Sequence, residues 1–249
     1  MGIPYVGSGV LGTALAAHQY SARQLLRHAG VRVPHHVLIN ARNQPRAEAS
    51  RIFNQLPLSP VRILPVTPPT QPLPARAEEE SEEWRCTGLA HSRDELADLI
   101  ARHRSRAALL AETEIPGRGL CVGILPERSG RPRALTLPAQ AHPLGDEALN
   151  HARDMARRAH RTLHLRGPAV HHLTLEGSTR PVWLSVETHP CLSGDGLLAG
   201  MAASRWGLSH PEFIGQLLQS ATTDATAHTD ALPTPAAANI ALVSERERR

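Results

Sequence analysis

Three glycines near the start of the chain have the spacing of a nucleotide-binding loop. Gly7, Gly9 and Gly12 in the stretch GSGVLG fit the pattern G-x-G-x-x-G. That pattern binds a dinucleotide when a full strand precedes it and an acidic residue follows about 20 residues later. Here the preceding apolar stretch is only residues 3–6, and the first acidic residue is Glu48. The pattern therefore favours a tight turn with a closely packed helix over a dinucleotide site.

Fifteen histidines raise the question of a metal site. Two adjacent pairs, His35–His36 and His171–His172, lie on expected strands. Neighbouring side chains on a strand point to opposite faces of the sheet, so neither pair is suited to chelating a single ion.

Basic side chains gather on a long helix expected at residues 146–164. They are His151, Arg153, Arg157, Arg158, His160, Arg161 and His164. Such a stripe is either the solvated face of an amphipathic helix or a surface for nucleic acid or an acidic partner. We favour the solvated face, because no aromatic residues accompany the stripe to stack on bases. We therefore expect no nucleic-acid partner.

All 27 residues in the lysine-plus-arginine count are arginines, and the chain contains no lysine. The formal net charge of +4 is only mildly basic. Chemistry that needs a lysine ammonium is therefore excluded. Arginine differs from lysine in shape and reach, so the replacement is not neutral at a tight phosphate site.

The cysteines and the apolar pattern indicate a cytoplasmic protein. Cys86, Cys121 and Cys191 lie far apart, which argues against a disulfide scaffold or a zinc ribbon, and Cys121 is expected in the core. No apolar run reaches the length of about 18 residues that a membrane span needs. The first residues lack the basic start and apolar run of a signal peptide. We expect no membrane partner.

Hydrophobic periodicity predicts alternating helices and strands. The expected helices cover residues 10–18, 21–30, 93–103, 146–164 and 210–220. The expected strands cover residues 3–6, 31–39, 60–64, 108–112, 120–125, 135–137, 169–175 and 181–186. Capping boxes beginning at Ser21, Ser92 and Ser209 mark three of the helix starts. The mixture, with a hairpin late in the chain, predicts an α+β fold in two small lobes.

Two segments depart from this pattern. Residues 66–85 are rich in proline and glutamate, and they are expected to form a flexible acidic loop. Residues 221–249 are rich in threonine, alanine and proline, and they are expected to form a disordered tail.

Four segments, taken in order, resemble the D-alanine–D-alanine ligase family. They are residues 2–39, 110–125, 180–193 and 200–218. The resemblance implies the two-lobed ATP-grasp fold, with a smaller lobe at residues 1–107 and a larger lobe at residues 108–220. The family has an N-terminal domain before the first matching segment, and we expect this chain to lack it.

The resemblance also assigns the positions that would bind ATP and magnesium. The family's glutamate beside adenine is matched by Glu112, with Thr113 and Ile115 in the same nucleotide-binding segment. The positions of two phosphate-binding lysines, a ribose-binding glutamate and a transition-state arginine are, in that order, Gln19, Leu64, Gly119 and Val170. The positions of the three magnesium ligands are His172, Ser185 and Glu187.

Most of these positions carry residues whose chemistry differs from that of the family. An ATP-grasp ligase phosphorylates a carboxylate and lets an amine displace the phosphate, which requires cations on phosphate and hard ligands for magnesium. Here only Glu187 offers magnesium a carboxylate, although His172 and Glu187 together would suit zinc. We therefore predict a degenerate ligase-like protein with no catalytic residues, with Glu112, Thr113 and Ile115 as the remaining nucleotide-side positions.

Two classes of function remain open. The first is a binding or scaffold protein that forms a homodimer or pairs with a ligase-family or cell-wall enzyme. The second is an active ATP-dependent carboxylate–amine ligase of peptidoglycan precursor synthesis, with ATP and magnesium as its cofactors. A decaying gene product without a maintained role is a third possibility.

Overall fold

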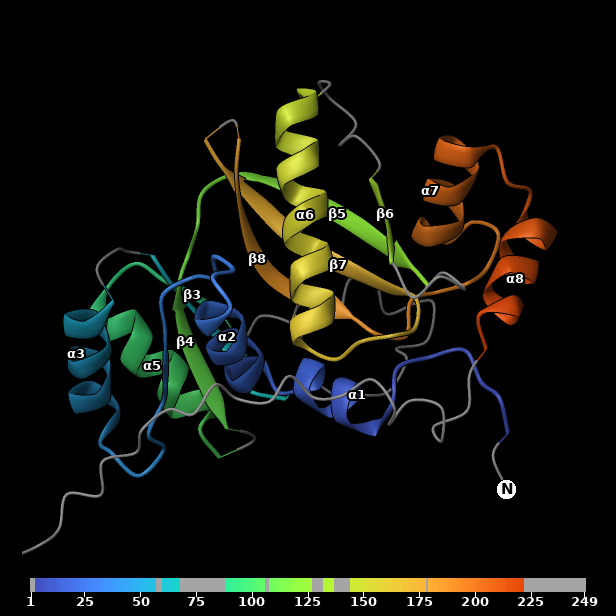
Figure 1. The fold of residues 1–249 in the computed structure, drawn as a ribbon. Helices are drawn as coiled ribbons and strands as arrows, with labels where there is room; N and C mark the ends of the chain where they lie inside the picture. The colour runs from blue at the N-terminus through green and yellow to red at the C-terminus, as the bar shows by residue number, and fades with distance from the viewer. Residues whose placement is uncertain are drawn as a thin grey trace, which may run out of the picture.

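The computed structural model describes residues 3–56, 60–67, 88–105, 108–126, 132–136, 144–177 and 179–221. These residues form two four-stranded antiparallel sheets with helices packed against them (Figure 1). The expected α+β class is confirmed. None of the helices in these ranges combines the length and apolar content that a membrane span needs.

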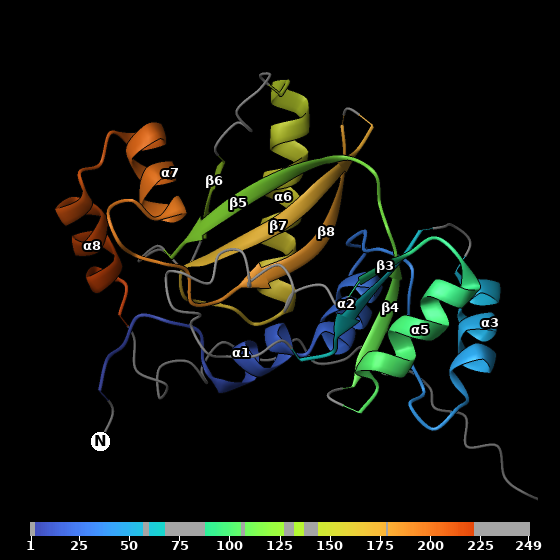
Figure 2. The same cartoon turned by 180° about the vertical axis from the view of Figure 1, so that it is seen from behind.

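The first sheet is covered by two helices, which bury an aliphatic core against it (Figure 2). Its strands, in spatial order, are β1 (His36–Leu38), β4 (Leu109–Thr113), β2 (Val61–Pro65) and β3 (Gly88–Ala90). The covering helices are α3 (Pro45–Gln55) and α5 (Arg93–His103). Ile63 of β2 lies opposite Ala111 of β4, and both side chains are fully buried in this core.

The second sheet has helices on both faces. Its strands, in spatial order, are β6 (Arg133–Thr136), β5 (Arg118–Leu125), β7 (Ala169–Glu176) and β8 (Arg180–Glu187). Alternate side chains of β5 and β7 pack on α6 (Asp146–Thr162). The opposite face packs on α7 (Leu197–Trp206) and α8 (His210–Gln219). The predicted long helix and the late hairpin are therefore confirmed.

The N-terminal helices connect the two sheets. They are α1 (Val10–Ala17) and α2 (Gln19–His28). Ala16 and Leu26 share a core with Leu163, after α6, and with Trp183 of β8. Helix α2 also contacts the first sheet, where the Tyr20 ring packs edge-on against the His36 ring of β1 with 5.7 Å between the ring centres.

The predicted lobe boundary at residues 107/108 does not coincide with the change from one sheet to the other. Residues 109–113 form β4, which pairs with both β1 and β2 inside the first sheet. The chain passes to the second sheet between Thr113 and Arg118. Residues 109–113, which the predicted boundary assigns to the larger lobe, thus form an inner strand of the first sheet.

The opening glycines make a close-packed turn, in agreement with the sequence-based expectation. A Cβ added to Gly12 would lie 2.5 Å from the carbonyl oxygen of His164. The Ser8 hydroxyl accepts hydrogen bonds from the backbone N–H groups of Arg166 and Gly167, at 3.1 and 3.2 Å. The G-x-G-x-x-G stretch therefore packs against the connection between α6 and β7.

Some predicted boundaries need correction. Helix α2 starts before Ser21, because the His18 side chain caps it by accepting a hydrogen bond from the Ser21 N–H at 3.2 Å. The strand predicted at residues 31–39 is reduced to β1, since the Arg32 carbonyl accepts from the Trp183 N–H of the other sheet. The strand predicted at residues 3–6 is reduced to a single bridge residue, Tyr5.

The sequence reading missed two elements of the first sheet layer. They are α3 and β3. A proline at the first position of α3 and buried Ala49 and Ile52 three residues apart were usable helix signals. By contrast, the capping box of α8 is present as predicted, with Glu212 accepting the Ser209 N–H at 2.8 Å. Residues 68–85 of the predicted acidic loop and residues 222–249 of the predicted tail lie outside the described residues.

Candidate functional site

The adenine-side position assigned by the resemblance is buried inside an ion pair. Glu112 on β4 is 4% exposed and Arg23 on α2 is 1% exposed. Arg23 Nη2 and Nε lie 2.8 and 3.1 Å from Glu112 Oε2. Burial raises the pKa of the Glu112 carboxyl, and the adjacent Arg23 charge opposes that shift. The negative charge of the Glu112 carboxylate is therefore balanced by the positive charge of Arg23 in the same chain.

Gln19, which the resemblance aligns with the family's first phosphate-binding lysine, is bound by the same arginine. Arg23 Nη1 donates to the Gln19 carbonyl at 3.2 Å and also to the Gln19 side-chain oxygen. The Arg23 guanidinium lies 5.9 Å from the centre of the Trp183 ring, close enough for a cation–π contact. Gln19 and Glu112 are thus linked through one buried cation between α2, β4 and β8.

The two neighbouring nucleotide-side positions have different surroundings. Thr113 is buried, and its Oγ1 finds no hydrogen-bond partner among the described residues. Ile115 borders a cavity of about 380 Å³, whose polar wall includes Arg27, Arg32, His35 and Glu176. Glu112 is not among the residues that line this cavity. The structure therefore separates Ile115 from the carboxylate with which it was grouped.

The expected metal-binding residues lie on one face of the second sheet. His172 is the cross-strand neighbour of both Cys121 and Ser185, and Glu187 pairs with Val170 two residues along. Cys121 Sγ lies 3.5 Å from His172 Nδ1. Burial, followed by the nearby Glu187 charge, raises the pKa of the half-buried Cys121 thiol. The thiol form is therefore favoured over a nucleophilic thiolate.

These residues do not fit a magnesium–nucleotide site. Magnesium binds oxygen ligands in near-octahedral geometry, usually through one or two carboxylates together with substrate phosphates. Here the positions offer one imidazole, one hydroxyl and one carboxylate, from His172, Ser185 and Glu187. Within the described ranges, no three histidine, cysteine or acidic side chains are grouped to hold a metal ion. This set of side chains therefore lacks the oxygen ligands that magnesium prefers.

A buried pair of histidines was missed by the sequence analysis. Trp183 Nε1 lies 3.1 Å from His171 Nδ1, and His171 Nε2 lies 3.3 Å from His160 Nδ1. An indole N–H can only donate, so His171 accepts at Nδ1 and donates from Nε2. His160 then accepts at Nδ1 and carries its own proton on Nε2. That atom has no hydrogen-bond partner among the described residues.

Burial keeps both imidazoles neutral. It lowers the pKa of His160 to about 4 and that of His171 well below its usual range. His160 was assigned to the solvated stripe of the long helix, and that assignment is wrong because its side chain faces β7. The usable signal was helical spacing, since His160 lies four residues after the buried Ala156.

The sequence matches no protein-family model. It is 28% identical over 247 residues to a D-alanine–D-alanine ligase of Nitrosospira multiformis, covering 88% of this chain and 71% of that protein. It is also 28% identical over 243 residues to the corresponding ligase of Desulforudis audaxviator, covering 89% and 74%. Over most of its length, the chain is thus similar in sequence to curated D-alanine–D-alanine ligases.

Solved structures of D-alanine–D-alanine ligases share its ATP-grasp fold. The Coxiella burnetii ligase superposes with a TM-score of 0.70 at 18% identity, covering 88% of this chain. A Bacillus anthracis ligase solved in complex with ATP gives a TM-score of 0.67 at 15% identity, again over 88% of this chain. This chain spans 61% of the Coxiella ligase chain and 69% of the Bacillus one.

Proposed function

We propose that this chain is a ligase-like ATP-grasp protein that does not catalyse ligation and instead has a binding role. The observation that carries the proposal is the engagement of both Glu112 and Gln19 by Arg23. Releasing Glu112 toward a nucleotide would leave Arg23 as an uncompensated charge in a buried setting, which is strongly unfavourable.

The second sheet supports the same proposal. Transfer of a phosphoryl group relies on cations and metal ions that neutralise the developing charge. On the face that would supply them, the corresponding positions are Val170, His172 and Ser185. No lysine exists elsewhere in the chain to compensate.

The partner that we propose is a second copy of this chain or a ligase-family enzyme of cell-wall synthesis. Exposed apolar side chains near the start of the chain support a protein partner, because burying apolar surface favours protein–protein association. They are Ile3, Val10 and Leu11, which are 77%, 84% and 58% exposed.

The deciding experiment is an assay of D-alanine-dependent phosphate release from magnesium–ATP. The Nitrosospira multiformis ligase is the positive control, and calorimetric titration with magnesium–ATP runs alongside. We expect no phosphate release above the rate without D-alanine. D-alanine-dependent release together with dipeptide formation would overturn the proposal and establish a carboxylate–amine ligase with rearranged residues around Glu112 and Glu187.

A further inference from the structure

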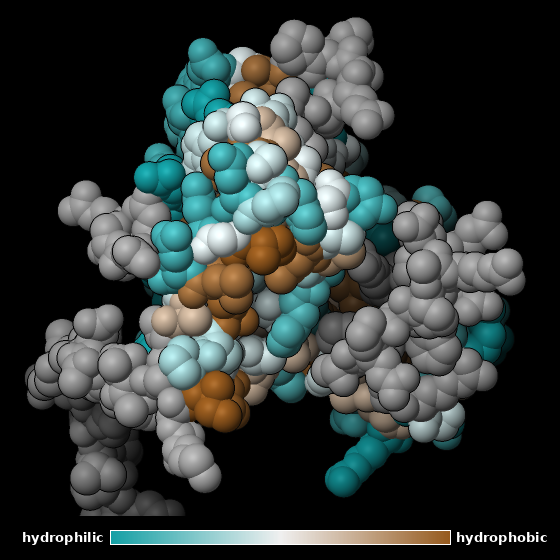
Figure 3. Space-filling view, turned by 90° about the vertical axis from the view of Figure 1, so that its right-hand side faces the viewer, coloured by the Kyte–Doolittle hydropathy of each residue, from teal (hydrophilic) through white to brown (hydrophobic). Residues whose placement is uncertain are grey.

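A separate cationic cavity lies at the β6 edge of the second sheet. It has a volume of about 280 Å³ and is lined by residues of the edge strand β6 and of α6 and α7. The lining side chains that carry the argument are Arg133, Asn150, Arg153, Arg157, Arg205 and Trp206, which we call the arginine pocket. Figure 3 views the side of the molecule that carries α7 and α8, where hydrophilic residues lie among paler, intermediate ones in the upper part and hydrophobic ones gather near the middle.

Two of its arginines are held in place by contacts within the fold. Arg153 donates to Asn150 Oδ1 at 3.1 Å and to Thr136 Oγ1 at 2.8 Å. The Arg133 guanidinium lies 5.1 Å from the centre of the Trp206 ring, in cation–π range. The guanidinium groups are thus partly arranged before any ligand arrives, which lowers the entropic cost of binding.

The local charge balance is strongly positive. Four guanidinium groups line one cavity. Arg157 is paired with Asp154 at 2.8 Å, and the charge of Asp146 acts on Arg153. Burial, together with repulsion from Arg205 and Arg157, lowers the pKa of Arg153. Like charges gathered in a concave site attract anions, and a bound anion would relieve their repulsion.

The chemistry of the lining selects phosphate groups. A guanidinium presents a planar pair of N–H donors that matches phosphate oxygens, and several such groups can bind adjoining phosphates. The volume is close to the lower end of small-ligand pockets, about 300 Å³, and the arginines converge on one cavity instead of following an extended strip. We propose that the arginine pocket binds a small anion that carries a diphosphate group.

The diphosphate can come from inorganic pyrophosphate or from a nucleoside diphosphate. This site is independent of the proposed function. It is at the β6 edge, whereas Glu112 belongs to the first sheet and the β8 edge is the one nearest to it (Figure 1). D-alanine-dependent phosphate release tests the proposed function, and metal-free pyrophosphate binding tests the arginine pocket. Failure of one proposal can therefore be distinguished from failure of the other.

The test is calorimetric titration of the full chain with pyrophosphate, orthophosphate and ADP at low salt in the presence of EDTA. We expect pyrophosphate to bind at least about tenfold more tightly than orthophosphate, because it engages more guanidinium groups. Equal affinities for ADP and pyrophosphate would assign recognition to the diphosphate alone. Tighter ADP binding would add a nucleoside contact to the same diphosphate site.

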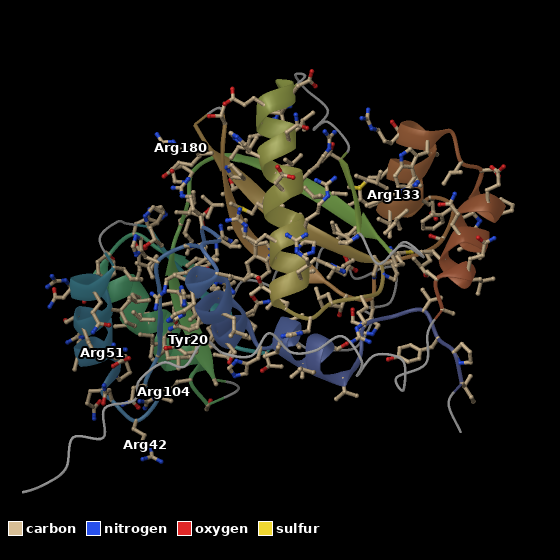
Figure 4. The ribbon with its side chains drawn as sticks, in the orientation of Figure 1. Tyr20, Arg42, Arg51, Arg104, Arg133 and Arg180 are labelled. Carbon is tan, nitrogen blue, oxygen red and sulfur yellow. The ribbon has the colours of Figure 1, made fainter. Side chains whose placement is uncertain are left out.

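The variants change one arginine inside the pocket and one arginine outside it. Arg205→Gln should weaken pyrophosphate binding by about tenfold or more. Arg205→Lys keeps the charge but loses the planar pair of donors, and it should also weaken binding. Arg180→Gln is the matched control, since Arg180 lies at the opposite side of the second sheet from Arg133 (Figure 4). Both Arg205 and Arg180 are exposed, so the variants should fold.

Three results would overturn the proposal. The first is no pyrophosphate binding by the wild-type chain up to about 1 mM, the affinity of a very weak complex. The second is the same loss of binding in Arg180→Gln as in Arg205→Gln, which would indicate a general charge effect. The third is Arg205-dependent binding of a single-stranded RNA without pyrophosphate binding, which would make the surface a nucleic-acid contact.

Discussion

Arg23 and Glu112, 89 residues apart in the chain, form a buried ion pair with an N–O distance of 2.8 Å. The pair joins α2 to the central strand β4 of the first sheet, and Arg23 also reaches the Trp183 ring of the second sheet. One side chain, Arg23, therefore bridges the two sheets through contacts with Glu112 and Trp183.

Removing one member of this pair should be far more harmful than removing both. Arg23→Met leaves the Glu112 carboxylate buried without its cation, and it should lower the free energy of unfolding by about 3–5 kcal/mol. The double variant Arg23→Met/Glu112→Leu should recover most of that loss. Urea unfolding measures all three proteins. Arg32→Met, which breaks the half-exposed pair with Glu176, serves as the control and should change little.

The close approach of α1 to the α6–β7 connection should make Gly12 intolerant of substitution. Gly12→Ala places a methyl group 2.5 Å from the backbone oxygen of His164 and should cost about 1–3 kcal/mol of stability. Gly215→Ala in α8 is the matched control, because its added methyl meets open space and should stabilise the helix by about 0.5–1 kcal/mol. Equal effects of the two variants on urea unfolding would contradict the packing argument.

The buried histidine pair should make the protein sensitive to mild acid. The pKa of His160 is lowered to about 4 in the folded chain, so the unfolded chain binds the proton first. The free energy of unfolding is unaffected by this imidazole above about pH 6.5, where the group is neutral in both states. It declines as the pH falls toward 4, because the unfolded chain takes up the proton first. The decline should reach roughly 3 kcal/mol at pH 4. Urea unfolding between pH 7 and 4 should show a shallower decline in His160→Gln, and an unchanged decline would refute this assignment.

Glu48 should make the folding stability depend on pH in a more acidic range than His160 does. Its buried carboxylate accepts hydrogen bonds from the Asn40 N–H at 2.7 Å and from Asn43 Nδ2 at 2.6 Å, and it pairs with Arg51. Burial alone would raise its pKa, but these hydrogen bonds and the Arg51 charge outweigh burial and lower it. The resulting stabilisation is present above the unfolded pKa near 4.5 and is lost as the pH falls through the lower folded value.

Glu48→Gln tests this in urea unfolding at pH 6 and pH 3. The variant should be less stable than the wild type at pH 6. The difference should shrink at pH 3, because below about pH 4.5 the unfolded wild-type chain takes up a proton more readily than the folded carboxylate does. A difference that is constant with pH would mean that shape, and not charge, explains the role of Glu48.

Elements with strong local patterns were predictable from the sequence. Helix α6 carries small apolar residues at helical spacing, and the hairpin of β7 and β8 has two apolar runs around a short turn. The similarity to the ligases also extends to the observed fold. Short elements such as β3 were missed, because three residues carry too little periodicity to indicate a strand.

The sequence by itself determined the α+β class, most long elements and the absence of lysine. Only the tertiary structure decided that Arg23 forms a buried ion pair with Glu112 and that His160 is buried against His171. It also decided that arginines of α6, β6 and α7 line one cavity. The physical reason is that local propensity depends on neighbours within a few residues. Ion pairs, buried imidazoles and cavities instead depend on which distant surfaces pack together.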